Sequence, residues 1–233
     1  MKNLYSFLFL LIVSLACADH SIAQTSLPVE AYSKAIAQPN IQILDVRTIG
    51  EYNSGYLKNA LQADWNNKEQ FFDRTQHLDK SKPVYVYCLG GGRSNAAAIA
   101  LREKGFTAIN LDGGINAWKQ AGKAVEGLKE DQKITESDYL KLTTEAKLVL
   151  IDFGAPWCPP CKKMEPVINN IRNTMGASIL VNYVDGGQNT QLMTDYKVDA
   201  MPTFIIYKQG KEVWRKQGIV SQEEFNTVIK SFQ

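Results

Sequence analysis

The chain has 233 residues, enough for two domains of average size. Its composition, 45% hydrophobic, 21% charged and 10% aromatic, is that of packed globular protein and excludes a disordered, collagen-like or polytopic membrane chain. The net charge is +2 and no block of like charge occurs, so nothing electrostatic indicates nucleic-acid binding.

The first predicted element is an export signal. Lys2 precedes an apolar run over residues 4–18, which is too short to cross a hydrocarbon core as a helix but suits a secretory signal. Small residues at Ser21 and Ala23 favour cleavage after residue 23, so we expect residues 1–23 to be removed and the protein to be periplasmic. One alternative is a membrane-anchored lipoprotein lipidated at Cys17, and another is an uncleaved membrane tether.

From residue 27, short apolar runs alternate with helical patterns. Residues 41–44 and 84–87 are predicted strands, rich in β-branched and aromatic side chains. Residues 94–104 are a predicted helix with an Ala-rich body, ended by Gly105. This alternation indicates βαβ units and a parallel sheet. We expect a first domain over residues 24–127, with the joint in the polar stretch 122–133.

The same alternation restarts in a second domain, expected over residues 128–233. Its predicted strands are residues 147–153, 179–184, 204–207 and 212–217, and its predicted helices are residues 161–175 and 221–232. A hairpin turn at Gln209-Gly210 joins the last two strands, so this sheet gains an antiparallel pair and is mixed. The short joint predicts that the two domains lie close together.

The first candidate catalytic residue is Cys88, which ends a predicted strand and is followed by Leu89, Gly90, Gly91, Gly92 and Arg93. A thiol here lies at a helix N-terminus, where backbone N–H groups and the Arg93 charge lower its pKa and favour the thiolate. The three glycines let several N–H groups converge, so residues 89–92 are a candidate cradle for an oxyanion or a persulfide sulfur. The alternative is a buried structural cysteine.

Three ordered motifs then resemble the rhodanese family of sulfurtransferases: residues 45–60, residues 88–94 and residues 113–118. The resemblance implies that Cys88 takes a sulfane sulfur from a donor and passes it to a nucleophilic acceptor. The C-x4-R spacing from Cys88 to Arg93 favours sulfur transfer over a cysteine phosphatase, whose loop is one residue longer. Leu89 replaces a frequent arginine, which weakens attraction for dianionic thiosulfate. Asp45, Arg47 and Glu51 are expected to be structural.

The second candidate site is the segment Trp157-Cys158-Pro159-Pro160-Cys161, between a predicted strand and a predicted helix. One thiol can attack a substrate disulfide and the other can resolve the mixed disulfide, because this spacing brings both sulfurs within bonding distance. Cys158 is the expected attacker, since it lies nearer the helix N-terminus, and Cys161 is the expected resolver. The alternatives are a zinc half-site, which lacks a second cysteine pair, and an inert structural disulfide.

Features around this motif resemble thioredoxin over residues 134–233: the cysteine pair, the helix proline Pro166 and residues 201–203. The resemblance implies that Asp152, six residues before Cys158, is the buried acid that assists proton transfer at the resolving cysteine. The strand 179–184 lacks the lysine that thioredoxins often place beside this acid.

The resemblance also implies substrate-binding residues around the dithiol. Met201 and Pro202 match the cis-proline loop, which lies against the disulfide and offers backbone hydrogen bonds to a substrate. Trp157 is interpreted as a lid over the dithiol, with a direct role in substrate binding as the alternative.

Together these patterns predict an α/β protein with a rhodanese-like parallel-sheet domain followed by a thioredoxin-fold domain with a mixed sheet. We expect Cys88 to carry a persulfide, and the Cys158/Cys161 dithiol to reduce it or to reduce protein disulfides. The expected partners are a sulfane-sulfur donor such as thiosulfate or a persulfide, thiol or disulfide protein substrates and an external reductant, with no cofactor, metal or nucleic acid. The alternative is a thiol-disulfide oxidoreductase for exported proteins, with the rhodanese unit an independent or non-catalytic module that binds sulfur species.

Overall fold

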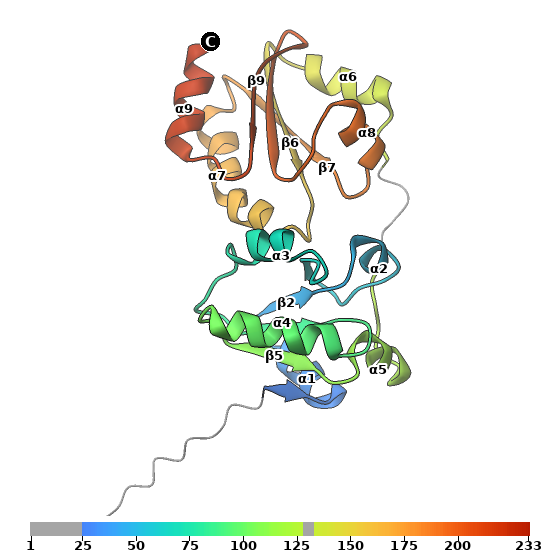
Figure 1. Ribbon diagram of the computed structural model, residues 1–233. Coiled ribbons are helices and arrows are strands. Elements are labelled where there is room, and N and C mark those ends of the chain that lie inside the picture. The colour runs from blue at the N-terminus through green and yellow to red at the C-terminus, as the bar shows by residue number, and fades with distance from the viewer. Residues whose placement is uncertain (1–24, 128–132) are drawn as a thin grey trace, which may run out of the picture.

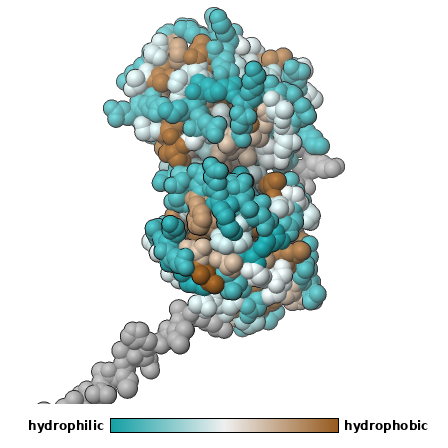
Figure 2. Space-filling model, viewed as in Figure 1, coloured by the Kyte–Doolittle hydropathy of each residue, from teal (hydrophilic) through white to brown (hydrophobic). Residues whose placement is uncertain are grey.

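The computed structural model describes residues 25–127 and 133–233, which form two α/β domains joined end to end (Figure 1). The predicted export signal and the alternative anchor at Cys17 lie outside these residues. Within the two described ranges, no helix combines the length and apolar character needed to cross a bilayer. On the face of the molecule shown in Figure 2, hydrophobic residues occur as small separate patches among hydrophilic ones.

The first domain is built on a parallel sheet with the strand order β1-β5-β4-β2-β3. Its strands are β1 (Ser26–Leu27), β2 (Gln42–Asp45), β3 (Leu61–Gln62), β4 (Val84–Tyr87) and β5 (Ala108–Leu111). Its helices are α1 (Val29–Ile36), α2 (Ile49–Asn53), α3 (Lys68–Thr75), α4 (Gly92–Glu103) and α5 (Gly114–Gln120). The parallel sheet confirms the predicted fold class, and it places the carboxyl end of β4, where Cys88 lies, beside the loops that follow β2 and β5.

Successive residues of β4 point to opposite faces of this sheet, so the domain has two cores. Val86 and Cys88 pack in the cluster that contains α3 and α4 residues such as Phe71 and Ala97. Tyr87 packs in the other cluster, with Leu111 of β5 and residues of α1 and α5. The Cys88 sulfur therefore belongs to the α4 face.

The buried pair Asp45 and Arg47 has the structural position expected for it. Arg47 Nη2 lies 2.5 Å from Asp45 Oδ2 and donates to the carbonyl of Gly55 at 2.7 Å. Gln62 of β3 donates to the Arg47 carbonyl at 2.7 Å. Because both charges are almost fully buried and paired, they fix the ends of β2 and β3 relative to each other.

The second domain has a mixed sheet with the order β7-β6-β8-β9, in which β6 is parallel to β7 and antiparallel to β8. Its strands are β6 (Leu148–Gly154), β7 (Leu180–Asp185), β8 (Thr203–Lys208) and β9 (Lys211–Gln217). Its helices are α6 (Glu136–Thr144), α7 (Pro159–Met175), α8 (Thr190–Asp195) and α9 (Gln222–Ser231). Helices α7 and α9 cover one face and α6 and α8 the other, which the two separate packing clusters of this domain reflect.

Helix α7 begins at Pro159, two residues before its predicted start. Proline is favoured in the first helical turn because the N–H groups of that turn have no partner within the helix, so the N–H that proline lacks is not missed. Cys158 is the N-cap residue, and its sulfur accepts a hydrogen bond from the Cys161 N–H at 3.3 Å. Both cysteines of the motif therefore lie at the positive end of the helix dipole.

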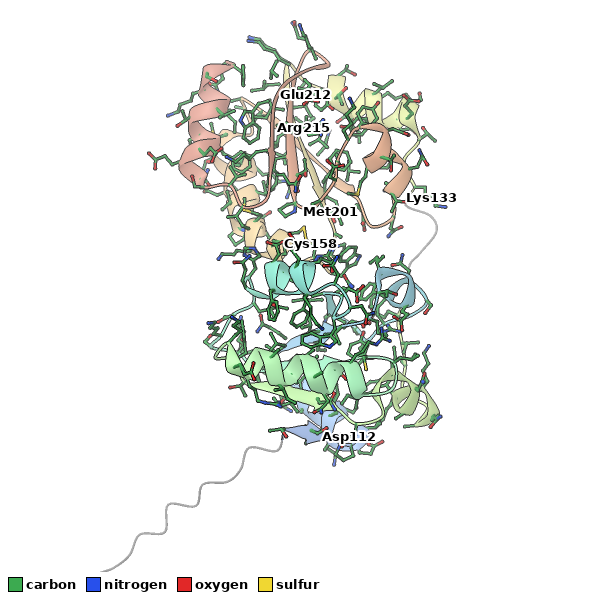
Figure 3. All side chains as sticks on the ribbon, in the orientation of Figure 1. Asp112, Lys133, Cys158, Met201, Glu212 and Arg215 are labelled. Atoms are coloured by element: carbon green, nitrogen blue, oxygen red, sulfur yellow. A yellow bond between two sulfur atoms is a disulfide. The ribbon has the colours of Figure 1, made fainter. Side chains whose placement is uncertain are left out.

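The two domains meet where the loop before α7 packs against the edge strand β3. The Gln62 N–H donates to the Trp157 carbonyl at 2.8 Å, so the loop pairs with the free edge of the first sheet. Trp157 and Cys158 share a packing cluster with Tyr52 and Leu57 of the first domain. Figure 3 shows Cys158 and Met201 at the end of the second domain that faces α3. We call the surface formed by β3 and α3 the docking face.

Candidate functional site

The Cys88 sulfur lies in a cradle of hydrogen-bond donors. The Gly91 N–H donates to Sγ at 3.1 Å, and the Ser94 hydroxyl donates to Sγ at 3.3 Å. Burial raises the pKa of this thiol, but the bonds from Ser94 and from the Gly90 and Gly91 backbone outweigh it, so the pKa is lowered overall. The cradle therefore stabilises a thiolate or a similarly placed anionic sulfur.

The N-terminal end of helix α5 holds this loop in place through backbone hydrogen bonds. The Ile115 N–H donates to the Cys88 carbonyl at 2.8 Å, and the Asn116 N–H donates to the Leu89 carbonyl at 3.1 Å. Gly114 has φ +59°, and a Cβ there would lie 2.5 Å from the Cys88 carbonyl oxygen. Only glycine allows this close approach, which explains the physical need for the glycine motif at residues 113–114.

Arg93 does not serve as the free cation that the sequence predicts beside Cys88. Its Nη2 lies 2.6 Å from Glu51 Oε1, and Nη1 donates to Glu51 Oε2 at 2.8 Å. Arg93 holds the pKa of Glu51 down at about 2, so the pair stays charged at all ordinary pH. Glu51 therefore neutralises much of the Arg93 charge at the mouth of the loop.

The Ser94 donor is a site residue that sequence reasoning assigned only to the start of the helix. A hydroxyl directly after the arginine of the loop is the signal that would have identified it, because the first turn of α4 returns it to the sulfur. At the mouth of the Cys88 loop, Leu89 is 43% exposed, and Gly90 and Gly92 are exposed as well. Gly91, in the same loop, is buried. The entrance to Cys88 thus combines the Arg93–Glu51 ion pair with the exposed Leu89 side chain and glycine backbone.

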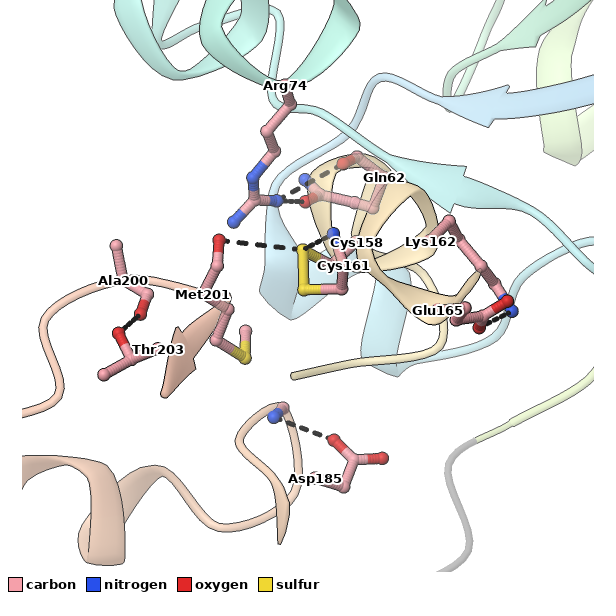
Figure 4. The surroundings of a disulfide bond; sticks show 11 residues. Gln62, Arg74, Cys158, Cys161, Lys162, Glu165, Asp185, Ala200, Met201 and Thr203 are labelled. Carbon is pink, nitrogen blue, oxygen red and sulfur yellow. Dashed lines mark hydrogen bonds and ion pairs between the residues drawn. A yellow bond between two sulfur atoms is a disulfide. The ribbon is translucent and has the colours of Figure 1, made fainter. Parts of the chain in front are cut away.

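Cys158 and Cys161 form a disulfide, and the predicted substrate loop with Met201 lies on one side of it (Figure 4). The Met201–Pro202 peptide bond is cis, and the Met201 carbonyl oxygen lies 3.7 Å from the Cys158 sulfur. Cys158 is 0% exposed, whereas Cys161 is partly exposed. Cys158 is buried where the two domains meet, in a packing cluster that also contains Tyr52 and Leu57 of the first domain.

Asp152, the predicted acid, lies on β6 and shares a cavity with Cys161. It lines a cavity of about 440 Å³ together with Cys161, Glu165, Arg172 and Tyr183. The pKa of Asp152 is raised to about 7, mainly by burial. The charge of Arg172 lowers this pKa, and the charge of Glu165 raises it. An acid with this pKa near a thiol can both accept and return a proton at neutral pH. Arg172, from α7, is the cation acting on the acid where the expected strand lysine is missing.

Trp157 is buried beneath the docking face. Its ring centroid lies 5.9 Å from that of Tyr52, and the Arg74 guanidinium carbon lies 5.1 Å from the ring centroid. The Trp157 ring therefore packs against residues of the first domain, and its role as a lid over the dithiol stays a prediction.

The structure keeps Cys88 apart from the dithiol. Among the described residues, no hydrogen bond or packing cluster joins Cys88 to Cys158 or Cys161. The sheet register aligns Gln62 of β3, Asp45 of β2 and Tyr87 of β4. Gln62, which bonds to Trp157, therefore lies two strand spacings, roughly 10 Å, from Tyr87, the residue before Cys88. Direct transfer between the sulfurs therefore requires the domains to move.

Comparison with known proteins agrees with this two-domain architecture. The family model described as Rhodanese-like domain matches residues 28–121, and that described as Thioredoxin matches residues 131–231. Thioredoxin of Bacillus subtilis is 31% identical over 97 residues, which are 42% of this chain and 92% of that protein. Thioredoxin Y of Oryza sativa chloroplasts is 35% identical over 101 residues, 43% of this chain and 60% of that protein. The chain spans three fifths of the length of such chloroplast relatives.

Among solved structures, a rhodanese-like domain protein from Staphylococcus aureus is 29% identical, with 46% of this chain and 100% of that chain covered and a TM-score of 0.39. The chain belongs to the thioredoxin family. It is a fusion in which a rhodanese-like domain precedes the thioredoxin domain. The two domains and the Cys158/Cys161 pair support thiol redox and sulfurtransferase-like roles.

Proposed function

We propose that the protein is a two-site sulfur-transfer enzyme in which Cys88 carries a persulfide and the Cys158/Cys161 dithiol reduces it. The observation that carries this proposal is the convergence of the Gly91 N–H and the Ser94 hydroxyl on the Cys88 sulfur. A merely structural cysteine needs no such donors, whereas a thiolate and the terminal sulfur of a persulfide both do.

The reaction begins when the Cys88 thiolate attacks the sulfane sulfur of thiosulfate or a persulfide, and sulfite or a thiolate leaves. The Cys158 thiolate then attacks the outer sulfur on Cys88, which frees the Cys88 thiolate and leaves a persulfide on Cys158. Attack by the Cys161 thiolate on the Cys158 sulfur closes the disulfide and releases sulfide. The dithiol loses two electrons and the sulfane sulfur gains them, so an external dithiol must reduce the disulfide again.

Asp152 has a defined place in this cycle. Cys161 must lose its proton before it attacks, and Asp152 lines the same cavity with a pKa of about 7. The acid accepts that proton when the disulfide closes and returns it when the disulfide is reduced.

Transfer from Cys88 to Cys158 requires the docking face to open. The joint between the domains then holds both sites on one chain, and such a tether gives an effective concentration of about millimolar if the geometry permits contact. The docked arrangement is therefore one state of the cycle, and an opened state carries out the transfer.

A second candidate function is a protein-disulfide oxidoreductase whose rhodanese-like domain works independently or only binds sulfur species. The separation of Cys88 from the dithiol favours it. In an insulin-reduction assay, this candidate predicts that Cys88→Ser leaves the rate unchanged with every disulfide substrate tested. Sulfide release that depends on both Cys88 and Cys158 would contradict it.

Export to the periplasm is part of the proposal, with lipid anchoring at Cys17 as the alternative. It is supported by the apolar segment at residues 4–18 and the small residues before Gln24. Mass spectrometry of the chain from its native cell tests it: a new N-terminus at Gln24 supports export, a lipidated Cys17 supports the anchor, and an intact Met1 in a cytosolic fraction contradicts both.

Persulfide formation is tested by incubating the reduced protein with thiosulfate, and separately with a small-molecule persulfide, before mass spectrometry. In Cys158→Ser, which cannot pass the sulfur on, we expect Cys88 to gain the mass of one sulfur atom, and we expect no such gain in Cys88→Ser. An unchanged Cys88 mass with both donors would overturn the sulfurtransferase half of the proposal.

A further inference from the structure

Arg74 of α3 brings a guanidinium from the rhodanese-like domain to the dithiol of the thioredoxin domain. Its guanidinium carbon lies 5.1 Å from the centre of the Trp157 ring, directly before Cys158 in the chain. Figure 4 shows the side chain reaching from the docking face toward the Cys158 sulfur and the Met201 carbonyl. The cation therefore reaches from one domain to the residue that directly precedes Cys158 in the other.

The guanidinium has neutral partners only. Nη1 donates to the Gln62 carbonyl at 3.3 Å and to the Gln62 side-chain oxygen. Within residues 25–127 and 133–233, no carboxylate forms an ion pair with Arg74. Burial lowers the pKa of Arg74 to about 10, against weak opposing effects of Asp73 and Asp64. Arg74 is partly buried, and a partly buried cation without a counter-ion is disfavoured, which points to an anion that forms in another state of the protein.

Reduction of the disulfide creates such an anion beside Arg74. Cys158 is the N-cap of α7, and its sulfur already accepts the Cys161 N–H, so this sulfur holds the negative charge once the S–S bond breaks. The Met201 carbonyl oxygen, 3.7 Å away, disfavours that charge. A cation on the side of the docking face offsets the carbonyl.

We propose that Arg74 is the counter-ion of the Cys158 thiolate, contributed by the rhodanese-like domain while the domains are docked. The inference rests on the proposed redox chemistry of the dithiol. On reduction, an external dithiol supplies two electrons, the S–S bond breaks, Cys161 takes a proton and Cys158 remains a thiolate against Arg74.

Docking and thiolate formation are then coupled. By linkage, if docking favours the Cys158 thiolate by some factor, the thiolate strengthens docking by the same factor. Oxidation to the neutral disulfide removes this contribution and leaves the Gln62–Trp157 hydrogen bond and apolar packing to hold the domains. The docking face therefore responds to the redox state of the dithiol that it covers.

Other charged groups around the contact act on both partners from several elements. They are Asp64, Asp73 and His77 around α3, Lys162, Lys163 and Glu165 on α7, Asp152 on β6 and Asp185 at the end of β7. All of these groups are kept in the Arg74 variants, so a difference in the Cys158 pKa between the variants reports the effect of Arg74 itself.

The test titrates Cys158 in the full chain. Cys17→Ser, Cys88→Ser and Cys161→Ser leave Cys158 as the one thiol, whose thiolate is followed by ultraviolet absorbance as the pH rises. In this background we expect Arg74→Gln and Arg74→Met to raise the Cys158 pKa by about one unit or more, because an opposite charge at close range shifts a pKa by ~1–3 units. Arg74→Lys should give an intermediate value.

Lys80→Gln is the matched control, since it removes one exposed cation from the same domain and should leave the titration unchanged. Near-ultraviolet circular dichroism identifies the variants that fold. One folded neutral variant, Arg74→Gln or Arg74→Met, is enough to decide the result. A Cys158 pKa equal to that of the parent in a folded neutral variant would overturn the inference. Persulfide loading of Cys88, measured separately, distinguishes this failure from failure of the proposed sulfur transfer.

Discussion

The charge at the mouth of the Cys88 loop is set by one carboxylate. Glu51 accepts hydrogen bonds from both Nη atoms of Arg93, and Leu89 of the same loop is exposed and apolar. A dianionic donor therefore meets little net positive charge on its way to the thiolate. This arrangement favours a donor that carries its sulfane sulfur on a less charged group, such as an organic persulfide.

Glu51→Gln should improve the use of thiosulfate. Glutamine can keep the capping box of α2 with Thr48 but removes the charge that pairs with Arg93. A partly exposed ion pair of this kind is worth ~1 kcal/mol, so we expect kcat/KM for thiosulfate to rise about fivefold, with little change for a neutral persulfide donor. Glu103→Gln, at the exposed end of α4, is the control. A fall in thiosulfate use with Glu51→Gln would contradict this role.

Asp152 should make both stability and rate depend on pH. Its folded pKa of about 7 lies above its ordinary value of 3.8, so the folded state binds more protons between these values. The contribution of Asp152 to stability is therefore complete below about pH 4 and is lost as the pH rises through 7.

Asp152→Asn should remove this dependence. We expect the variant to be more stable than the wild type at pH 8, on the order of 4 kcal/mol in urea unfolding, and equally stable near pH 4. Disulfide closure should be slower, and its rise with pH through about 7 should disappear. Asp199→Asn, an exposed acid of the same domain, serves as the control. Equal pH profiles for Asp152→Asn and the wild type would contradict the assignment.

At the scale of elements, both reactive segments are loops that run from a buried strand into a helix. Cys88 follows β4 and precedes α4, and Cys158 follows β6 and caps α7. Strand and helix patterns with flanking glycines and prolines predict these positions within about two residues, because local composition decides them. The sequence did not predict β1, β3, β5, α1, α2, α3, α5, α6 or α8. The shortest of these, β1, β3, α2 and α8, carry no such pattern and form through tertiary contacts.

The support of the Cys88 loop by α5 gives a test at this scale. Gly114→Ala puts a Cβ 2.5 Å from the Cys88 carbonyl oxygen at φ +59°, so the loop must shift. We expect persulfide loading of Cys88 to slow at least about tenfold and stability to fall by ~1–3 kcal/mol. Gly122→Ala is the matched control, since Gly122 has φ +69° but no atom within 4 Å of the added Cβ. Equal loading rates in the two variants would contradict the loop support.

At the scale of the whole molecule, the docking of the dithiol against β3 and α3 is what separates this protein from two independent modules. The short joint predicts closeness, and the Gln62–Trp157 hydrogen bond agrees with it. Sequence could not predict which surfaces meet, because the contact joins a two-residue edge strand to a loop from another domain. For the same reason Arg74 and Ser94 escaped prediction, since each acts through a neighbour supplied by the fold.

The central claim is that the dithiol of one domain reduces the persulfide formed on the other. A single-turnover experiment tests it directly: the full chain is reduced, freed of reductant and mixed with a persulfide donor, and sulfide and protein masses are followed. The account predicts one sulfide per chain with a Cys158–Cys161 disulfide in the wild type, and a persulfide retained on Cys88 without sulfide release in Cys158→Ser. Equal sulfide release from both proteins, or a wild type that keeps its Cys88 persulfide beside a reduced dithiol, would contradict it.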